Sequence, residues 1–182
     1  AGNGVALIGS NNTVHNCTIH DVNYVVTDCA AVHLGERETT NNAITHCKLY
    51  NTGRELISHS GAKNLKILHN EMFNNRRGTE PWDMGATYMI ATDGDGTEIA
   101  YNYIHDIRSI GIYLDGGPTS NCNIHHNVIW NISYTKVDLA LHMNMPATNH
   151  KIYNNTFVDS YISTNLINDS YTARMEGTEI KN

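Results

Sequence analysis

The chain has 182 residues, 40% of them hydrophobic, which is enough to bury one core and makes a single domain over residues 1–182 the expectation. A net charge of −6 with only 12 Lys and Arg residues argues against a general binder of nucleic acids or anionic membranes, because both attract basic surfaces. No apolar stretch approaches the ~18 residues of a membrane-spanning helix, so we expect no membrane insertion.

An eight-residue template recurs six times along the chain. It starts with an aliphatic residue and has Asn or Cys at its fourth position, an apolar residue at its sixth and Asn or Asp at its eighth. The copies are VHNCTIHD (14–21), ITHCKLYN (44–51), ILHNEMFN (67–74), IAYNYIHD (99–106), IHHNVIWN (124–131) and IYNNTFVD (152–159). Spacings of 23 to 32 residues are too long for hairpins and fit one coil of three short strands. The repeat therefore predicts an all-β solenoid of about six to seven stacked parallel coils.

A second apolar stretch precedes each template, as in AVHLG, LISHS, TYMIA, GIYLDG, LALHMN and TNLIND, so each coil contributes at least two strands. The chain opens within a coil and closes partway through a template at GTEIKN. We therefore expect it to be an internal piece of a longer solenoid, with flanking coils of the same polypeptide as neighbours.

The fourth template position predicts a buried column of side chains. Its asparagines can pair with backbone groups of a buried turn and with one another in successive coils; they are Asn70, Asn102, Asn127 and Asn155. Cys17 and Cys47 occupy the same column, where a small buried thiol is favoured over a disulfide. Cys29 and Cys122 have no assigned state.

Two further columns are assigned to the scaffold. The eighth template position falls where the strand must turn, and Asx residues tolerate left-handed backbone there; its members are Asp21, Asn51, Asn74, Asp106, Asn131 and Asp159. The third position faces outward by strand alternation and is favoured as solvated surface over a metal-binding row; its members are Asn16, His46, His69, Tyr101, His126 and Asn154.

The stretch WDMGATYMIATDGDGTEIAYNYIHD (82–106), together with GIYLDGG, NIHHNVIWN and IYNNTF, resembles the right-handed parallel β-helix proteins of the pectate-lyase-like superfamily. The resemblance extends over essentially the whole chain and is specific for the fold. That superfamily includes pectate and alginate lyases, polygalacturonases and other glycoside hydrolases, uronate epimerases and phage tailspikes. The resemblance implies a polysaccharide partner, bound in a groove along one face, and a secreted or periplasmic location.

The longest interval between templates, residues 67–99, offers a pair of carboxylates. Asp83 comes just before the strand at residues 86–91, and Asp115 ends the equivalent strand of the next coil. Neighbouring coils lie ~4.8 Å apart. The two carboxylates can therefore fall within the ~5 to 10 Å that glycoside hydrolysis requires, and they are the leading catalytic pair.

The same interval holds a polar and aromatic cluster suited to binding a sugar acid, with an ordinary surface loop as the equal alternative; it consists of Arg76, Arg77, Glu80 and Trp82. His33, Arg54 and Asp138 are further candidates for substrate binding.

Two other functions stay open. A uronate lyase or epimerase would use His59, Tyr88 or His142 as general base or acid. Lyases of the superfamily rely on Lys or Arg as the base, and the absence of such a residue from these strands favours a hydrolase. The remaining alternative is a non-catalytic, tailspike-like or adhesin-like module that binds glycans.

The segment TDGDGTE places Asp93, Asp95 and Glu98 at a spacing that suits Ca²⁺, although Asp-Gly pairs are also the commonest signal for a tight turn. The turn is favoured, so the expected cofactor is none, or Ca²⁺.

Overall fold

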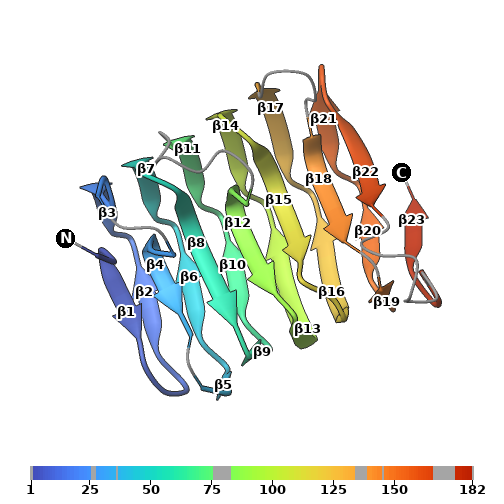
Figure 1. Cartoon of the computed structure of the whole chain (residues 1–182), viewed down its shortest axis with the longest axis horizontal. Helices are drawn as coiled ribbons and strands as arrows, with labels where there is room; N and C mark the ends of the chain where they lie inside the picture. Colours follow the sequence, from blue (N-terminus) through green and yellow to red (C-terminus); the bar gives the residue numbers. More distant parts are fainter. Residues whose placement is uncertain are drawn as a thin grey trace.

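The computed structural model describes residues 2–25, 28–35, 37–75, 83–133, 139–144, 146–165 and 175–181. Every regular element in these ranges is a β-strand (Figure 1). Within the same ranges, no helix is long and apolar enough to cross a membrane.

The strands form three main parallel sheets that run the length of the stack. Sheet 1 contains β1 (Val5–Leu7), β4 (Ala30–Leu34), β8 (Glu55–Ser60), β12 (Gly85–Ile90), β15 (Ile110–Asp115), β18 (Leu139–Asn144) and β22 (Tyr161–Asn165). Sheet 2 contains β2 (Thr13–His15), β6 (Ala43–Thr45), β10 (Lys66–Leu68), β13 (Asp93–Ala100), β16 (Thr119–His125), β20 (Lys151–Tyr153) and β23 (Glu179–Lys181), with β19 (Ala147–Thr148) beside β16. Sheet 3 contains β3 (Thr18–Val22), β7 (Lys48–Thr52), β11 (Glu71–Asn75), β14 (Tyr103–Ile107), β17 (Val128–Ile132) and β21 (Thr156–Val158). The short strands β5 (Thr39–Thr40) and β9 (Ala62–Lys63) pair separately.

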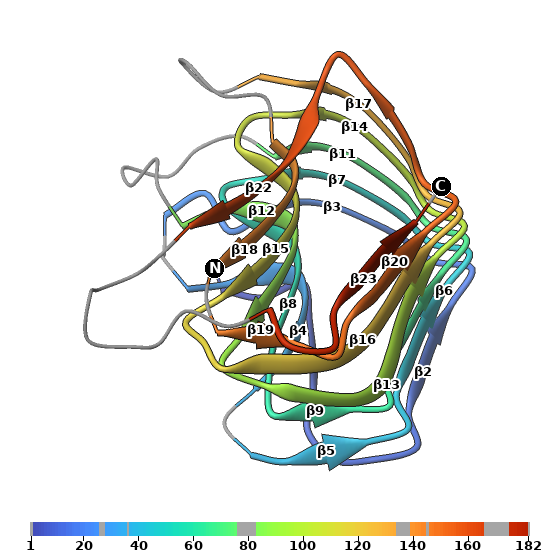
Figure 2. The same cartoon turned by 90° about the vertical axis from the view of Figure 1, so that its right-hand side faces the viewer.

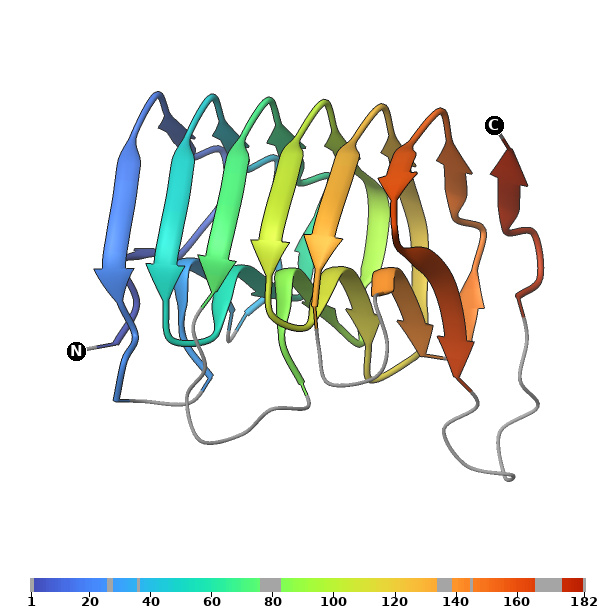
Figure 3. The same cartoon turned by 90° about the horizontal axis from the view of Figure 1, so that it is seen from above.

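The chain visits sheets 1, 2 and 3 in turn, and each strand pairs with its equivalents in the neighbouring coils. Figure 2 looks along the stack, where strands of one sheet lie behind one another, and Figure 3 shows sheet 3 from the side. The predicted parallel solenoid is confirmed. Its core is one continuous cluster in which template residues of successive coils are in register, as Ile67 is with Ile44 and Ile99.

The predicted asparagine column is confirmed in detail. The Asn102 Oδ1 atom accepts hydrogen bonds from the Asn70 backbone N–H (2.9 Å) and from Asn70 Nδ2 (3.1 Å). Asn102 Nδ2 donates to the Ile67 carbonyl (2.8 Å) and to Asn127 Oδ1 (3.0 Å). Asn127 and Asn155 repeat these contacts one coil later. Each amide therefore satisfies turn backbone groups that have no strand partner.

Buried His150 plays an equivalent part at a turn of sheet 2. Its Nδ1 atom accepts the Cys122 backbone N–H (3.2 Å), and its Nε2 atom lies 3.3 Å from Thr119 Oγ1. The proton therefore resides on Nε2, and burial lowers the pKa of His150 to about 4.

The cysteines of the asparagine column differ from each other. Cys47 is buried, as expected, and its thiol donates to the Val14 carbonyl (3.6 Å) in the way that Asn70 Nδ2 donates to the Ile44 carbonyl. Cys17 is exposed, so the expectation of a buried thiol is wrong there, because no described coil packs beneath it. All four cysteines are free thiols.

The residues of both scaffold columns, at the third and eighth template positions, adopt the left-handed backbone conformation. The Asx column has φ between 51° and 57°, as predicted. The outward column has φ between 52° and 58°, although it includes His and Tyr, for which this conformation costs ~1 to 2 kcal/mol. Ring stacking accompanies it: the ring centroids of His46 and His69 lie 4.8 Å apart, and those of His69 and Tyr101 lie 4.9 Å apart.

Candidate functional site

A polar and aromatic row runs along the outer face of sheet 1. Strand register aligns, coil after coil, His33, Ser58, Tyr88, Tyr113 and His142. The residue that follows each of them points into the core; these residues are Leu34, His59, Met89, Leu114 and Met143. The residues of the row therefore lie on the outer face of sheet 1, and the residues that follow them pack in the interior.

His59 lies on the inner side of this boundary. It is 1% exposed, and neither ring nitrogen has a hydrogen-bond partner among the described residues. Burial lowers the pKa of its ring to about 4, which keeps the ring neutral. Strand alternation turns the His59 side chain inward, so His59 is in register with Met89 and does not belong to the outward row of Tyr88.

Asp115 is the centre of a hydrogen-bond network at the end of β15. The Tyr88 hydroxyl donates to Asp115 Oδ2 at 2.6 Å, and Asn144 Nδ2 donates to Asp115 Oδ1. Asn144 Nδ2 also donates to the Tyr113 hydroxyl (2.8 Å). Asp115 is 9% exposed, so these donors on neighbouring coils fix the orientation of a carboxyl group that retains a narrow opening to solvent.

Asp83 belongs to the segment just before β12 and lies close to the same hydrogen-bond network. Its side chain lies near Tyr113 and Asp115, because both groups influence its pKa. Desolvation and the charge of Asp115 raise the pKa of Asp83, whereas Arg54 lowers it. The structure thus brings the predicted carboxylate pair together, with Asp115 buried and Asp83 exposed.

The two tyrosines of the network have different roles: the Tyr88 hydroxyl donates to Asp115, whereas the Tyr113 hydroxyl accepts from Asn144 Nδ2. Burial raises the pKa of both Tyr88 and Tyr113, and the neighbouring charge of Asp115 raises it further. Both hydroxyls therefore stay protonated at neutral pH. Their rings, 5.2 Å apart, pack with Ile110 and Leu139 in a small apolar cluster separate from the main core.

His142 orients Asn144 from the same strand. Its Nε2 atom lies 3.0 Å from Asn144 Oδ1. The Asn144 amide nitrogen donates to Asp115 and Tyr113, so its oxygen is the acceptor, and His142 Nε2 carries the proton. Sequence reasoning missed Asn144. The signal was present, since LALHMN aligned with GIYLD puts Asn144 beside Asp115.

A second group of charges flanks the network near the start of β8. Arg54 Nε donates to the Asp83 carbonyl (2.9 Å) and lies 2.7 Å from Glu55 Oε1, while Arg54 Nη1 pairs with Asp28. Glu55 is 1% exposed, and desolvation raises the pKa of its carboxyl group to about 8 despite the attraction of Arg54. Arg54 therefore anchors the segment that carries Asp83. Glu55 and Asp28 were not among the sequence candidates, and no motif marks them.

The other candidates lie elsewhere. His33 Nδ1 is 2.7 Å from Ser58 Oγ, further along the outward row. Arg76, Arg77, Glu80, Trp82 and Asp138 lie outside the described residues.

Two of the three candidate calcium ligands, Asp93 and Glu98, have other side-chain partners. Asp93 Oδ1 accepts hydrogen bonds from the Asp95 backbone N–H (3.1 Å) and from Asn121 Nδ2 (2.7 Å). Glu98 forms ion pairs with Lys66 and His125. Across the described part of the chain, no group of three His, Cys, Asp or Glu side chains is placed to hold a metal ion. The segment belongs to strand β13, where the register shifts between Asp93 and Thr97, and Asp93 Oδ1 holds the backbone of this irregularity.

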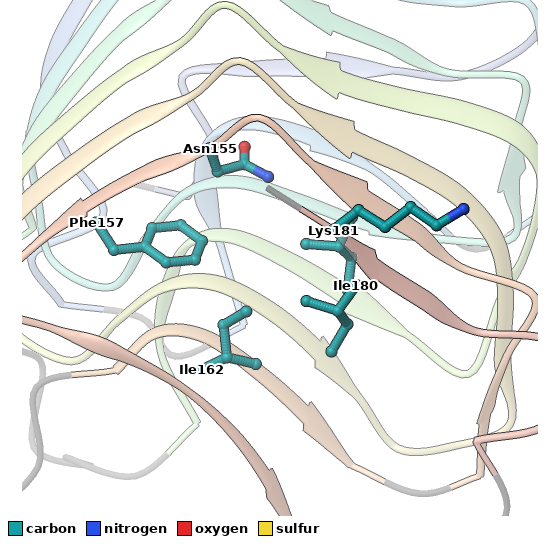
Figure 4. A pocket seen from close by; sticks show the side chains of 6 residues that line it. Asn155, Phe157, Ile162, Ile180 and Lys181 are labelled. Carbon is teal, nitrogen blue, oxygen red and sulfur yellow. The ribbon is translucent and has the colours of Figure 1, made fainter.

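A cavity of about 330 Å³ lies at the last coil, away from this network. In Figure 4 the side chains of Phe157, Ile162 and Ile180 face one another across it, with Asn155 and Lys181 at its edge. Its lining is mostly apolar and includes none of the candidate site residues.

The parallel coils, the internal asparagine column and the polar row on sheet 1 place this chain among the β-helix proteins. It belongs to the family described as the right handed beta helix region, whose family model matches residues 1–161. This assignment agrees with the resemblance to the pectate-lyase-like superfamily, a fold compatible with carbohydrate-active proteins. No curated protein and no solved structure matches the chain.

Proposed function

We propose that this protein is a glycoside hydrolase that cleaves a secreted or periplasmic polysaccharide on the outer face of sheet 1. The observation that carries the proposal is that exposed Asp83 lies close enough to buried Asp115 for the charge of Asp115 to raise the pKa of Asp83, while Tyr88 and Asn144 hold Asp115 in place. Paired carboxylates in different environments are what acid catalysis of glycosidic cleavage requires.

Each carboxyl group has a distinct role in the proposed reaction. Asp83, whose pKa is raised, protonates the glycosidic oxygen as the bond to the anomeric carbon breaks. Asp115, held by Tyr88 and Asn144, attacks the anomeric carbon. Water, deprotonated by Asp83, then attacks the glycosyl–Asp115 intermediate and releases the sugar with its anomeric configuration retained.

The test measures new reducing ends on a panel of neutral and anionic polysaccharides. We expect Asp83→Asn and Asp115→Asn each to lower kcat/KM by at least ~100-fold, because each removes a group that acts only in the transition state. Asp93→Asn is the matched control, since Asp93 holds the backbone of the irregular part of β13, outside the network. Undiminished cleavage by Asp83→Asn on every substrate of the parent would overturn the assignment.

The lyase or epimerase alternative is supported by Tyr88 and His142, which lie in the same row and contact the same network. It predicts the ultraviolet absorbance of an unsaturated uronate, or inversion at C5 without cleavage, and tolerance of Asp83→Asn. Binding of a glycan without any turnover would instead indicate a non-catalytic module.

A further inference from the structure

Cys17 and Cys47 are direct neighbours in adjacent coils. Each immediately precedes a strand of sheet 3, β3 and β7, and the next residues, Thr18 and Lys48, are in register. The Lys48 backbone N–H donates to the Cys17 carbonyl at 2.9 Å. Neighbouring parallel strands are ~4.8 Å apart, which falls inside the Cα separations of ~4.4 to 6.8 Å that disulfides span.

The two thiols also belong to the same column. Both occupy the column position of Asn70 in adjacent coils, and the Cys17 side chain is near enough to contribute to the raised pKa of the Cys47 thiol. Their other contacts are weak thiol bonds to carbonyl oxygens, such as Cys17 Sγ to the His15 carbonyl at 3.3 Å and Cys47 Sγ to the Thr45 carbonyl at 3.3 Å. Forming a bond between the sulfurs therefore removes few stabilising interactions.

The remaining cysteines are placed differently. Cys122 is fully buried in the core, with its sulfur 3.5 Å from Met89 Sδ. Cys29 immediately precedes β4 of sheet 1, in another column. Of the four cysteines, only Cys17 and Cys47 are therefore neighbours in the same column.

We propose that Cys17 and Cys47 form a disulfide that ties the first two template coils together. The Cys17 thiolate, which is exposed, attacks a small disulfide such as oxidised glutathione and expels one glutathione thiolate. The Cys47 thiolate then attacks the Cys17 sulfur of the mixed disulfide and expels the second. Two electrons pass to glutathione, and the two thiol protons are released to solvent or to the departing thiolates.

The test treats the full chain with oxidised glutathione at a pH of about 8.5, because burial raises the pKa of Cys47 and slows the second step at neutral pH. We expect the free thiols to fall from the four present to two, and the mass to fall by about 2 Da. Digestion at Lys, Arg and Asp places Cys17, Cys29 and Cys47 on separate peptides, so mass spectrometry identifies the bridge. A peptide linking Cys17 to Cys47 supports the proposal.

Thermal unfolding supplies an independent readout. Closing a loop of about 30 residues should raise the midpoint by roughly 5 to 10 °C relative to the reduced chain. Cys29→Ser should keep this shift and Cys17→Ser should abolish it; Cys17 is chosen because it is exposed and its substitution leaves the buried thiol in place. Four persisting thiols, a stable glutathione adduct on Cys17, or a bridge to Cys29 would each overturn the proposal.

Discussion

Replacing Asn102 by Ala tests how the asparagine column holds the coils together. Asn102 is 1% exposed, and its side chain satisfies two buried backbone groups, the Asn70 N–H and the Ile67 carbonyl. The substitution leaves both groups without a partner, and each orphaned buried group costs about 1 to 3 kcal/mol. Asn127 Oδ1 loses the hydrogen bond from Asn102 Nδ2 but keeps the one from the Asn102 backbone N–H, so it adds little to the loss of stability. We expect the free energy of unfolding to fall by about 3 to 5 kcal/mol.

Urea denaturation followed by far-ultraviolet circular dichroism gives this free energy, provided that the m-value is unchanged. The control is Asn123→Ala on β16, the same chemical change at a partly exposed position, for which we expect a loss of no more than ~0.5 kcal/mol. Equal losses for the two variants would refute the reasoning, because they would mean that the column does not satisfy the backbone of the turns.

Three more predictions concern other parts of the molecule. Tyr88→Phe removes the hydroxyl that donates to Asp115, so kcat/KM should fall ~10- to 100-fold in the reducing-end assay, and unchanged kinetics would contradict the proposed orientation of the carboxylate. Gly53→Ala puts a methyl group 1.6 Å from the Asn23 carbonyl oxygen, so urea denaturation should show a loss of more than ~3 kcal/mol; a parental midpoint would show that this backbone contact is absent. The Glu55 carboxyl has a pKa of about 8 in the fold against 4.5 unfolded, so the fold holds the proton more tightly. The free energy of unfolding should therefore decrease, by up to about 4 kcal/mol, as pH rises from 4.5 to 8. In the Glu55→Gln variant, the free energy of unfolding should change less between pH 4.5 and 8 than in the parent. An equal change in both proteins would contradict this prediction.

The sequence repeat predicts which residues form the core and which form the turns in successive coils. Because each coil contacts only its neighbours in register, a period in the sequence becomes a column in space. The fourth template position predicted the hydrogen bonds of Asn70 and Asn102, and the eighth predicted left-handed backbone at Asp21 and Asn51.

The repeat could not assign the faces of sheet 1. Strict alternation fails at the start of its strands, where consecutive residues such as Leu56 and Ile57 both enter the core. If the assumed strand register is shifted by one residue, side chains expected in the core are placed on the outer face, and the reverse. His59 and Tyr88 both look like groove residues in the sequence, and only the register places His59 in the core.

The sequence by itself determined the solenoid, its asparagine column and its left-handed turns, because these depend on contacts between equivalent positions. Only the tertiary structure decided that Asp83 lies near Asp115 and Tyr113, and that Asn144 completes the network. Those contacts join positions that are not equivalent in the repeat. No periodicity encodes them, and they depend on how Arg54 anchors the segment before β12 against the stack.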